Sequence, residues 1–134
     1  MARSIRTGKG GFTLLELMIV LTIIAILAGI AIPMYRATVI RAKEAVLKDN
    51  LHSIRSVIDQ YTADKKKAPQ ALQDLVDAGY FRELPEDPIT GSRDTWEIIR
   101  DTSVSAPDQT ESGITDVKSG SSEISSDGTP YNSW

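Results

Sequence analysis

One carboxylate, Glu16, stands near the start of an apolar run that continues to Tyr35. Leu17 to Tyr35 carry no charge, and as a helix rising 1.5 Å per residue they would span roughly 28 Å, about the thickness of a bilayer's hydrocarbon core. A charge at membrane depth costs about 2.5–3.5 kcal/mol, which a partner of opposite charge would offset. The pattern predicts a membrane-spanning helix with Glu16 in a functional role.

The charges before this run predict its orientation. Arg3, Arg6 and Lys9 precede it without any acidic residue, so the positive-inside bias places residues 1–11 in the cytoplasm and the remaining chain outside. An ordinary secretory signal also has a basic start, but it ends in small residues at a cleavage site and carries no carboxylate. We therefore expect a single-pass protein with its N-terminus inside.

The junction Gly10-Gly11-Phe12-Thr13-Leu14-Leu15-Glu16 resembles the leader junction of type IV pilins and of the pseudopilins of type II secretion. The resemblance implies that a prepilin peptidase cuts after Gly11 and N-methylates Phe12. It also implies that Glu16 of one subunit pairs with the Phe12 ammonium of a neighbour and sets the register of a helical filament. The alternative is that Glu16 is a tolerated polar residue near a membrane interface.

Apolar residues beyond the predicted span recur at spacings of seven, four, three, four and three, which indicates one stripe of an amphipathic helix reaching about Asp64. Its members are Ile40, Leu47, Leu51, Ile54, Ile58 and Tyr61. Two oppositely charged pairs four residues apart, Glu44 with Lys48 and Arg55 with Asp59, are predicted to support the solvent-facing side of this helix.

Pro33 lies inside the predicted helix, where a helix break in the form of a bend or a local loss of hydrogen bonding is expected, because proline has no N–H to donate. Pilin-like proteins have a proline at the corresponding place, in a segment that can melt during assembly. The lysine triplet 65–67 precedes Pro69 and reads as a helix end followed by a solvated turn. Nucleic-acid binding is not favoured, since no aromatic residues or wider basic patch accompany these lysines.

The rest of the chain predicts a small α+β domain. A short helix should contain Leu72, Leu75 and Val76 and end at Gly79, with residues 80–84 entering the core. Residues 84–91 contain two prolines and a glycine, which is typical of a loop. Strands are expected over 95–100 and around residues 114–117, forming a small antiparallel sheet.

Residues 72–96 resemble the major pseudopilin branch, especially Leu75-Val76-Asp77-Ala78-Gly79-Tyr80-Phe81 and Leu84-Pro85-Glu86-Asp87-Pro88. The chain departs from the common form in continuing with Ile89-Thr90-Gly91 and in having a later Trp96. The implied organisation is a leader at 1–11, a transmembrane and assembly half-helix at 12–35, and a periplasmic domain at 36–134.

Composition agrees with a small exported domain. The chain has 134 residues, 15 basic and 18 acidic, and without its leader it would have 12 basic against 18 acidic residues. This acidity argues against general nucleic-acid binding. The chain has no cysteine, so no disulfide stabilises the outer domain. Many type IV pilins close their C-terminal region with a disulfide whereas major pseudopilins usually lack one, which favours the latter.

The Ser- and Gly-rich stretch 119–134 reads by composition as a flexible tail, but it ends in Tyr131 and Trp134, which need a packing surface. Major pseudopilins commonly bind calcium in a C-terminal loop, and calcium prefers oxygen ligands. By resemblance, the predicted ligands are Asp127 first, then Asp116, Ser119 and Ser122. A solvated loop without metal is the alternative.

Enzyme functions find no support. His52 is the single histidine and lies beside the apolar stripe, where exposure or a subunit contact is expected. Cysteine-based and multi-histidine metal chemistry are excluded by residue counts.

The resemblance instead implies a structural subunit of a periplasmic pseudopilus of a type II secretion system, in the inner membrane. The implied partners are further copies, minor pseudopilins, the prepilin peptidase, a platform protein and an assembly ATPase. The alternatives are a surface type IV pilin and a membrane-anchored binding domain that does not polymerise.

Overall fold

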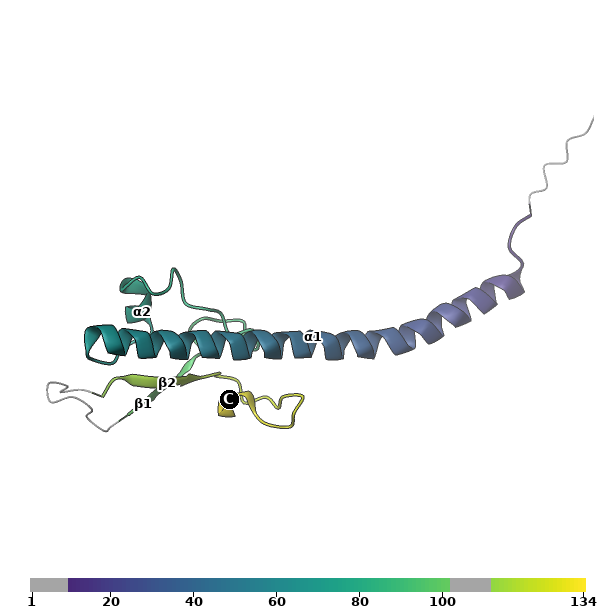
Figure 1. Cartoon of the computed structure of the whole chain (residues 1–134). Helices are drawn as coiled ribbons and strands as arrows, with labels where there is room; N and C mark the ends of the chain where they lie inside the picture. Colours follow the sequence, from purple (N-terminus) through teal and green to yellow (C-terminus); the bar gives the residue numbers. More distant parts are fainter. Residues whose placement is uncertain (1–9, 102–111) are drawn as a thin grey trace, which may run out of the picture. The chain divides into compact units, whose positions relative to one another are not determined.

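The computed structural model describes residues 10–101 and 112–134 (Figure 1). These residues form α1 (Leu14–Lys65), α2 (Gln73–Asp77), β1 (Glu97–Arg100), β2 (Ile114–Lys118) and the 3₁₀ helix η1 (Tyr131–Ser133). The chain divides into two compact units, the first ending at Thr38 and the second comprising Val39–Trp134. The predicted α+β class is confirmed.

Helix α1 continues without interruption from Leu14 to Lys65, in agreement with the predicted extent. Pro33 lies inside this continuous helix, and the expected bend or local loss of hydrogen bonding there stays a prediction. Proline withholds a single N–H, and the hydrogen bonds of the residues around it can maintain the helix. By length and composition, α1 contains a stretch that could cross a membrane.

The core of the Val39–Trp134 unit lies along one stripe of α1. Five of the six predicted stripe residues are buried: Leu47, Leu51, Ile54, Ile58 and Tyr61. Ile40 is 46% exposed, so the stripe starts later than predicted. The reason is that the first residue of α1 to be covered by the rest of the domain is Glu44.

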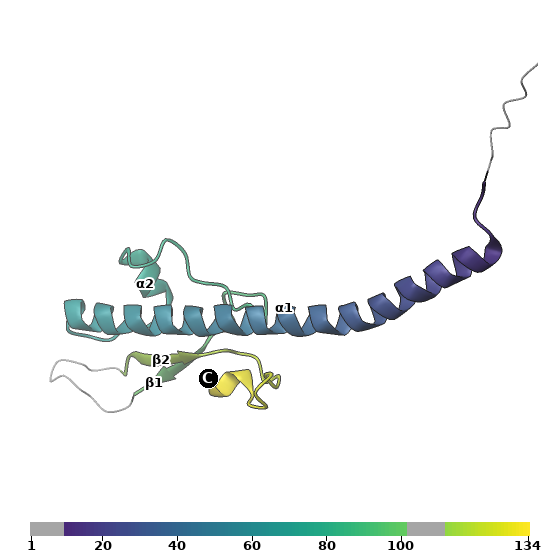
Figure 2. The ribbon, with the colours of Figure 1, turned by 45° about the vertical axis from the view of Figure 1, so that its right-hand side comes forward.

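Two layers cover this part of α1. In both views α2 lies on one side of the helix, while the β1–β2 sheet and the C-terminal segment lie on the other (Figures 1 and 2). Leu75 contributes to the core from α2, Ile114 and Val117 from β2, and Trp96 from the residue before β1. Tyr131 completes the cluster from η1.

Helix α2 ends as the sequence predicted. Gly79 has φ of 84°, a left-handed conformation that glycine adopts without a steric penalty. Tyr80, Phe81 and Leu84 follow it and pack, partly buried, against the core. The predicted loop over 84–91 is confirmed, and within it the buried Asp87 accepts a hydrogen bond from the backbone N–H of Ile89 at 2.9 Å.

Strands β1 and β2 pair antiparallel, as predicted, with Ile98 opposite Val117 and a register shift between Ile99 and Arg100. After β2, the chain passes directly over the residue that precedes Trp96. A Cβ on Gly120 would lie 2.0 Å from the carbonyl oxygen of Thr95, so only glycine fits there. This close approach lies at the start of residues 119–134, which we call the C-terminal segment.

Candidate functional site

The predicted cleavage junction lies just outside the first turn of α1. Gly11 and Phe12 are non-helical and exposed, and the Phe12 side chain is 75% exposed. The backbone N–H of Glu16 donates to Oγ1 of Thr13 at 3.2 Å, which caps the helix start. A non-helical, accessible peptide bond followed by a capped helix is an arrangement that a protease can reach.

The sequence reasoning missed this cap, although its signal was present. A Thr followed three residues later by Glu just before an apolar run is the capping-box pattern. Glu16 therefore also occupies the first turn of α1, where the helix dipole favours a negative charge. Among residues 10–101 and 112–134, neither of the two ion pairs involves Glu16.

The side chains around Glu16 have no covering within the chain. The large apolar residues from Phe12 to Tyr35 are all at least 41% exposed. A continuous apolar surface of this length marks a membrane or protein interface. The N-terminal half of α1 therefore offers an apolar helix that carries one carboxylate.

A second group of polar contacts fastens the C-terminal segment to α1. The carboxylate of Glu44 accepts hydrogen bonds from the backbone N–H of Ser126 at 2.7 Å and from the Ser126 hydroxyl at 2.5 Å. The Tyr131 hydroxyl donates to Glu44 Oε1 at 2.9 Å. The prediction that Glu44 faces solvent was wrong, since only 6% of this residue is exposed.

These contacts alter the acidity of both residues. Burial raises the pKa of Glu44, but the hydrogen bonds from Ser126 and Tyr131 and the nearby charge of Lys48 outweigh it, so the pKa lies below the ordinary 4.5. Burial and the Glu44 carboxylate together raise the pKa of Tyr131 to about 12. Glu44 is therefore held as a carboxylate and Tyr131 as a neutral phenol.

Arg55 makes the second connection. Its Nε donates to Asp116 Oδ1 at 2.6 Å, and its Nη2 donates to the carbonyl oxygens of Val117 at 2.9 Å and Trp134 at 2.6 Å. The sequence predicted that Arg55 pairs with Asp59 on the solvent-facing side of the helix. In the structure Arg55 pairs with Asp116, across the domain. Because Asp116 is far away in sequence, no local spacing in the helix could signal the contact.

Lys48 lies between these two anchors on α1. Its Nζ is 4.6 Å from the ring centroid of Trp134, a cation–π contact. The ring of Trp134 in turn packs edge-on against Tyr131, with centroids 5.2 Å apart. Spacings of four and seven place Glu44, Lys48 and Arg55 on one face of the helix.

The predicted calcium ligands do not converge on one another. Asp116 Oδ1 is occupied by Arg55 and by the backbone N–H of Val117 at 2.7 Å. The buried Ser119 hydroxyl donates to Asp87 Oδ2 at 2.6 Å. Within the described parts of the chain, no group of three or more His, Cys, Asp or Glu residues is placed to hold a metal ion.

The two remaining predicted ligands, Ser122 and Asp127, are exposed. Asp127 lines a hollow of about 350 Å³ that Lys48 and Arg55 also line. Two permanent cations at that hollow oppose the binding of a third. The residues as they lie do not fit a calcium site, and calcium binding stays a prediction.

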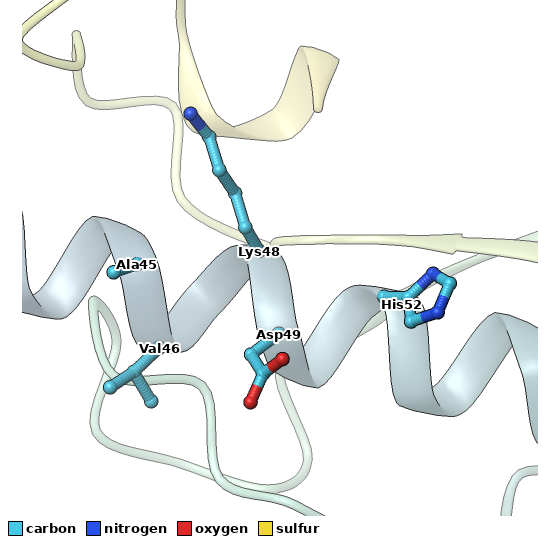
Figure 3. A pocket seen from close by; sticks show the side chains of 5 residues that line it. All are labelled: Ala45, Val46, Lys48, Asp49 and His52. Atoms are coloured by element: carbon cyan, nitrogen blue, oxygen red, sulfur yellow. The ribbon is translucent and has the colours of Figure 1, made fainter.

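His52 is exposed, as expected, on an open groove of about 590 Å³ along α1. Figure 3 shows the lining side chains, all arising from α1, with Lys48 extending toward the C-terminal segment. They are Ala45, Val46, Lys48, Asp49 and His52. A groove open to water along one helix offers no enclosed site for catalysis.

Known proteins resemble this chain at the predicted cleavage junction and also over a longer stretch of the sequence. A family model described as the prokaryotic N-terminal methylation motif matches residues 6–32. The type II secretion system core protein G of Klebsiella michiganensis is 31% identical over 102 residues, covering 64% of this chain and 72% of that protein. The protein of the same name from Pseudomonas aeruginosa is 32% identical over 99 residues, covering 62% and 70%.

A second kind of relative matches a shorter stretch. The type IV major fimbrial protein FimA of Dichelobacter nodosus is 43% identical over 62 residues, covering 46% of this chain and 39% of that protein. No solved structure matches the chain significantly.

Proposed function

This chain belongs to the type II secretion system core protein G family, and we propose that it is a structural subunit of a periplasmic pseudopilus that drives protein export. The observation that carries this function is the extent of the similarity. The methylation motif covers residues 6–32, whereas the alignment with the Klebsiella michiganensis protein covers 102 residues and so includes much of the folded domain.

The membrane anchor follows from α1. The chain is anchored in the inner membrane through the apolar half of this helix. In the proposal, Val39–Trp134 lies in the periplasm, in agreement with the basic residues Arg3, Arg6 and Lys9 before the span.

Processing comes before assembly in the proposal. A prepilin peptidase cuts between Gly11 and Phe12 and methylates the new amino group of Phe12. Support comes from the match of residues 6–32 to the methylation motif and from the exposure of both junction residues. The cut removes three basic residues and leaves a cationic N-terminus four residues before Glu16.

Polymerisation then covers the exposed apolar helix. The side chains from Phe12 to Tyr35 pack against the same region of neighbouring subunits, and the Glu16 carboxylate pairs with the Phe12 ammonium of a neighbour. Glu16 has no ion-pair partner within the described chain, so an incoming cation would offset its cost in an apolar bundle. This pairing would fix the axial register of the filament.

The proposal assigns Pro33 to the region that loses helical hydrogen bonds when a subunit leaves the bilayer. The missing N–H of proline lowers the cost of melting there. Partners beyond further copies of the chain are the prepilin peptidase, minor pseudopilins, a platform protein and an assembly ATPase. The role is structural, and catalysis is assigned to the partners.

The surface pilin is the second candidate, because FimA is 43% identical over part of the chain. That similarity covers 46% of the chain, whereas the core protein G relatives named above cover 62–64%. The broader coverage favours the pseudopilus. Pili on the surface of intact cells carrying this protein at its natural level would favour the pilin instead.

The decisive experiment is complementation of a strain that lacks this protein. The unaltered chain should restore secretion and give cross-linked multimers, whereas Glu16→Ala should still insert into the inner membrane but give neither. Glu123→Ala removes an exposed carboxylate from the folded domain and is the matched control. Normal multimers and normal secretion with Glu16→Ala would contradict the filament and support the non-polymerising anchor.

A further inference from the structure

The C-terminal segment is held in a defined place although its composition predicts flexibility. It has no cysteine to form a disulfide, yet Tyr131 is 4% exposed and Ser121 and Ser125 are buried. Something must connect this segment to the rest of the domain strongly enough to offset the loss of backbone entropy. The contacts of Arg55 and Glu44 identify that connection.

We propose that the Arg55 guanidinium is a built-in cation that joins β2 to the end of the C-terminal segment, so that the domain keeps this segment in place without calcium. The guanidinium collects three oxygens from two parts of the chain: Asp116 Oδ1, the Val117 carbonyl and the Trp134 carbonyl. Gathering carboxylate and carbonyl oxygens is the task that a calcium ion performs in a loop.

A guanidinium suits this task for two physical reasons. It is charged at all physiological pH values, and its planar fork of N–H donors can serve several acceptors at once. Nε of Arg55 donates to Asp116 on β2, and Nη2 donates both to Val117 on β2 and to Trp134, at distances of 2.6–2.9 Å. Asp116 supplies a negative charge directly opposite the guanidinium.

Glu44 complements Arg55 because its carboxylate accepts hydrogen bonds, which a guanidinium cannot do. The turn around Ser126 presents N–H and O–H donors, and these require a negative or neutral acceptor. The Glu44 carboxylate binds the Ser126 N–H, the Ser126 hydroxyl and the Tyr131 hydroxyl. One helix thus provides an anion for the donors of the segment and a cation for its acceptors.

The turn itself uses further polar groups internally. The backbone N–H of Ser125 donates to the Thr129 carbonyl at 2.8 Å, and that of Gly128 donates to the Ser125 carbonyl at 3.0 Å. Trp134 Nε1 donates to the Thr129 hydroxyl at 2.9 Å. Asp127 takes no part in these bonds through its side chain and instead lines the hollow that Lys48 and Arg55 also line.

The test uses the full-length processed protein in detergent micelles and follows thermal unfolding by tryptophan fluorescence. Trp96 and Trp134 are the only two tryptophans and both lie in the Val39–Trp134 unit, so the signal reports this unit. The expected midpoint is the same in millimolar calcium and in excess chelator. Asp127→Ala should also leave it unchanged under both conditions.

Substitution of Arg55 supplies the second arm. Arg55→Met keeps the aliphatic stem and removes the charge, and it should lower the midpoint by about 5 °C or more for a domain of this size. Arg93→Met is the matched control, because Arg93 forms an exposed ion pair with Glu83 at 3.0 Å. Arg55→Lys should fall between the unaltered protein and Arg55→Met, and it remains measurable if Arg55→Met does not fold.

Two results would overturn the proposal. One is a calcium-dependent rise of the midpoint in the unaltered protein that Asp127→Ala abolishes. The other is an Arg55→Met midpoint equal to that of Arg93→Met. Neither depends on polymerisation, so the outcome is distinct from that of the secretion experiment.

Discussion

Tyr131 donates its hydroxyl to Glu44 Oε1 at 2.9 Å, a hydrogen bond between residues 87 positions apart in the sequence. Both residues are nearly fully buried, so the bond connects the last turn of the chain to the middle of α1 away from water. A buried hydrogen bond to a charged group contributes more than a neutral one, and its loss leaves a polar group without its partner. The pair is therefore a sensitive point for the stability of the domain.

Tyr131→Phe should destabilise the domain by about 1–2 kcal/mol near neutral pH, because Glu44 loses one donor while the ring still fills its place. The pKa of about 12 in the folded state, above the ordinary 10.0, adds a signature at high pH. The contribution of the Tyr131 hydroxyl to the free energy of unfolding is present below pH 10 and is lost as the pH rises toward 12. Denaturant titrations at neutral and alkaline pH measure both effects, and an equally alkali-sensitive Tyr131→Phe would argue against this origin.

Glu44 should make the domain sensitive to acid. Folding lowers the pKa of Glu44 below 4.5. The contribution of Glu44 to the free energy of unfolding is therefore present above pH 4.5 and is lost as the pH falls through the pKa of the folded state. Glu44→Gln should lower the free energy of unfolding by about 1–3 kcal/mol at neutral pH, since a neutral amide has one acceptor oxygen and cannot accept the same hydrogen bonds as the carboxylate. The variant should also show a smaller further loss below pH 4.5 than the unaltered protein.

The acid experiment needs a matched control, for which Glu123→Gln serves because Glu123 is exposed. Denaturant midpoints for both variants across the acidic range make the comparison. The same pH dependence in Glu44→Gln as in Glu123→Gln would show that other carboxylates account for acid unfolding.

Gly120→Ala should destabilise the domain by about 1–3 kcal/mol, because the new methyl group must displace backbone. Its Cβ would lie 2.0 Å from the carbonyl oxygen of Thr95. Gly29→Ala is the control, since a Cβ there meets no atom within 4 Å in the chain. Tryptophan fluorescence melts in detergent should separate the two, and equal midpoints would contradict the close approach of the two backbones.

Processing at the junction can be read from the intact mass of the membrane-extracted protein. The expected chain begins at N-methylated Phe12. Gly11→Val should block the cut, because a branched side chain replaces hydrogen at the scissile residue, whereas Gly8→Ala should be cut normally. An unaltered chain that keeps its first eleven residues, or is cut elsewhere, would contradict prepilin processing.

The sequence by itself determined the features that depend on local pattern. An uncharged run of membrane-spanning length, an amphipathic stripe and a glycine-ended short helix each carry a recognisable period or punctuation, and α1, α2 and the loop after Leu84 follow them. The methylation motif was readable for the same reason, since its residues are contiguous. The sheet was predicted in place, although β1 begins at Glu97, later than expected.

Tertiary structure alone decided which charges face inward and what holds the C-terminal segment. Local spacing paired Glu44 with Lys48 and Arg55 with Asp59, because residues four apart are neighbours on a helix. In the folded chain Ser126 binds Glu44, whose pKa the nearby Lys48 also lowers, and Asp116 rather than Asp59 pairs with Arg55. Such partners lie far away in sequence, and side-chain spacing within one helix contains no information about which distant segment will cover it.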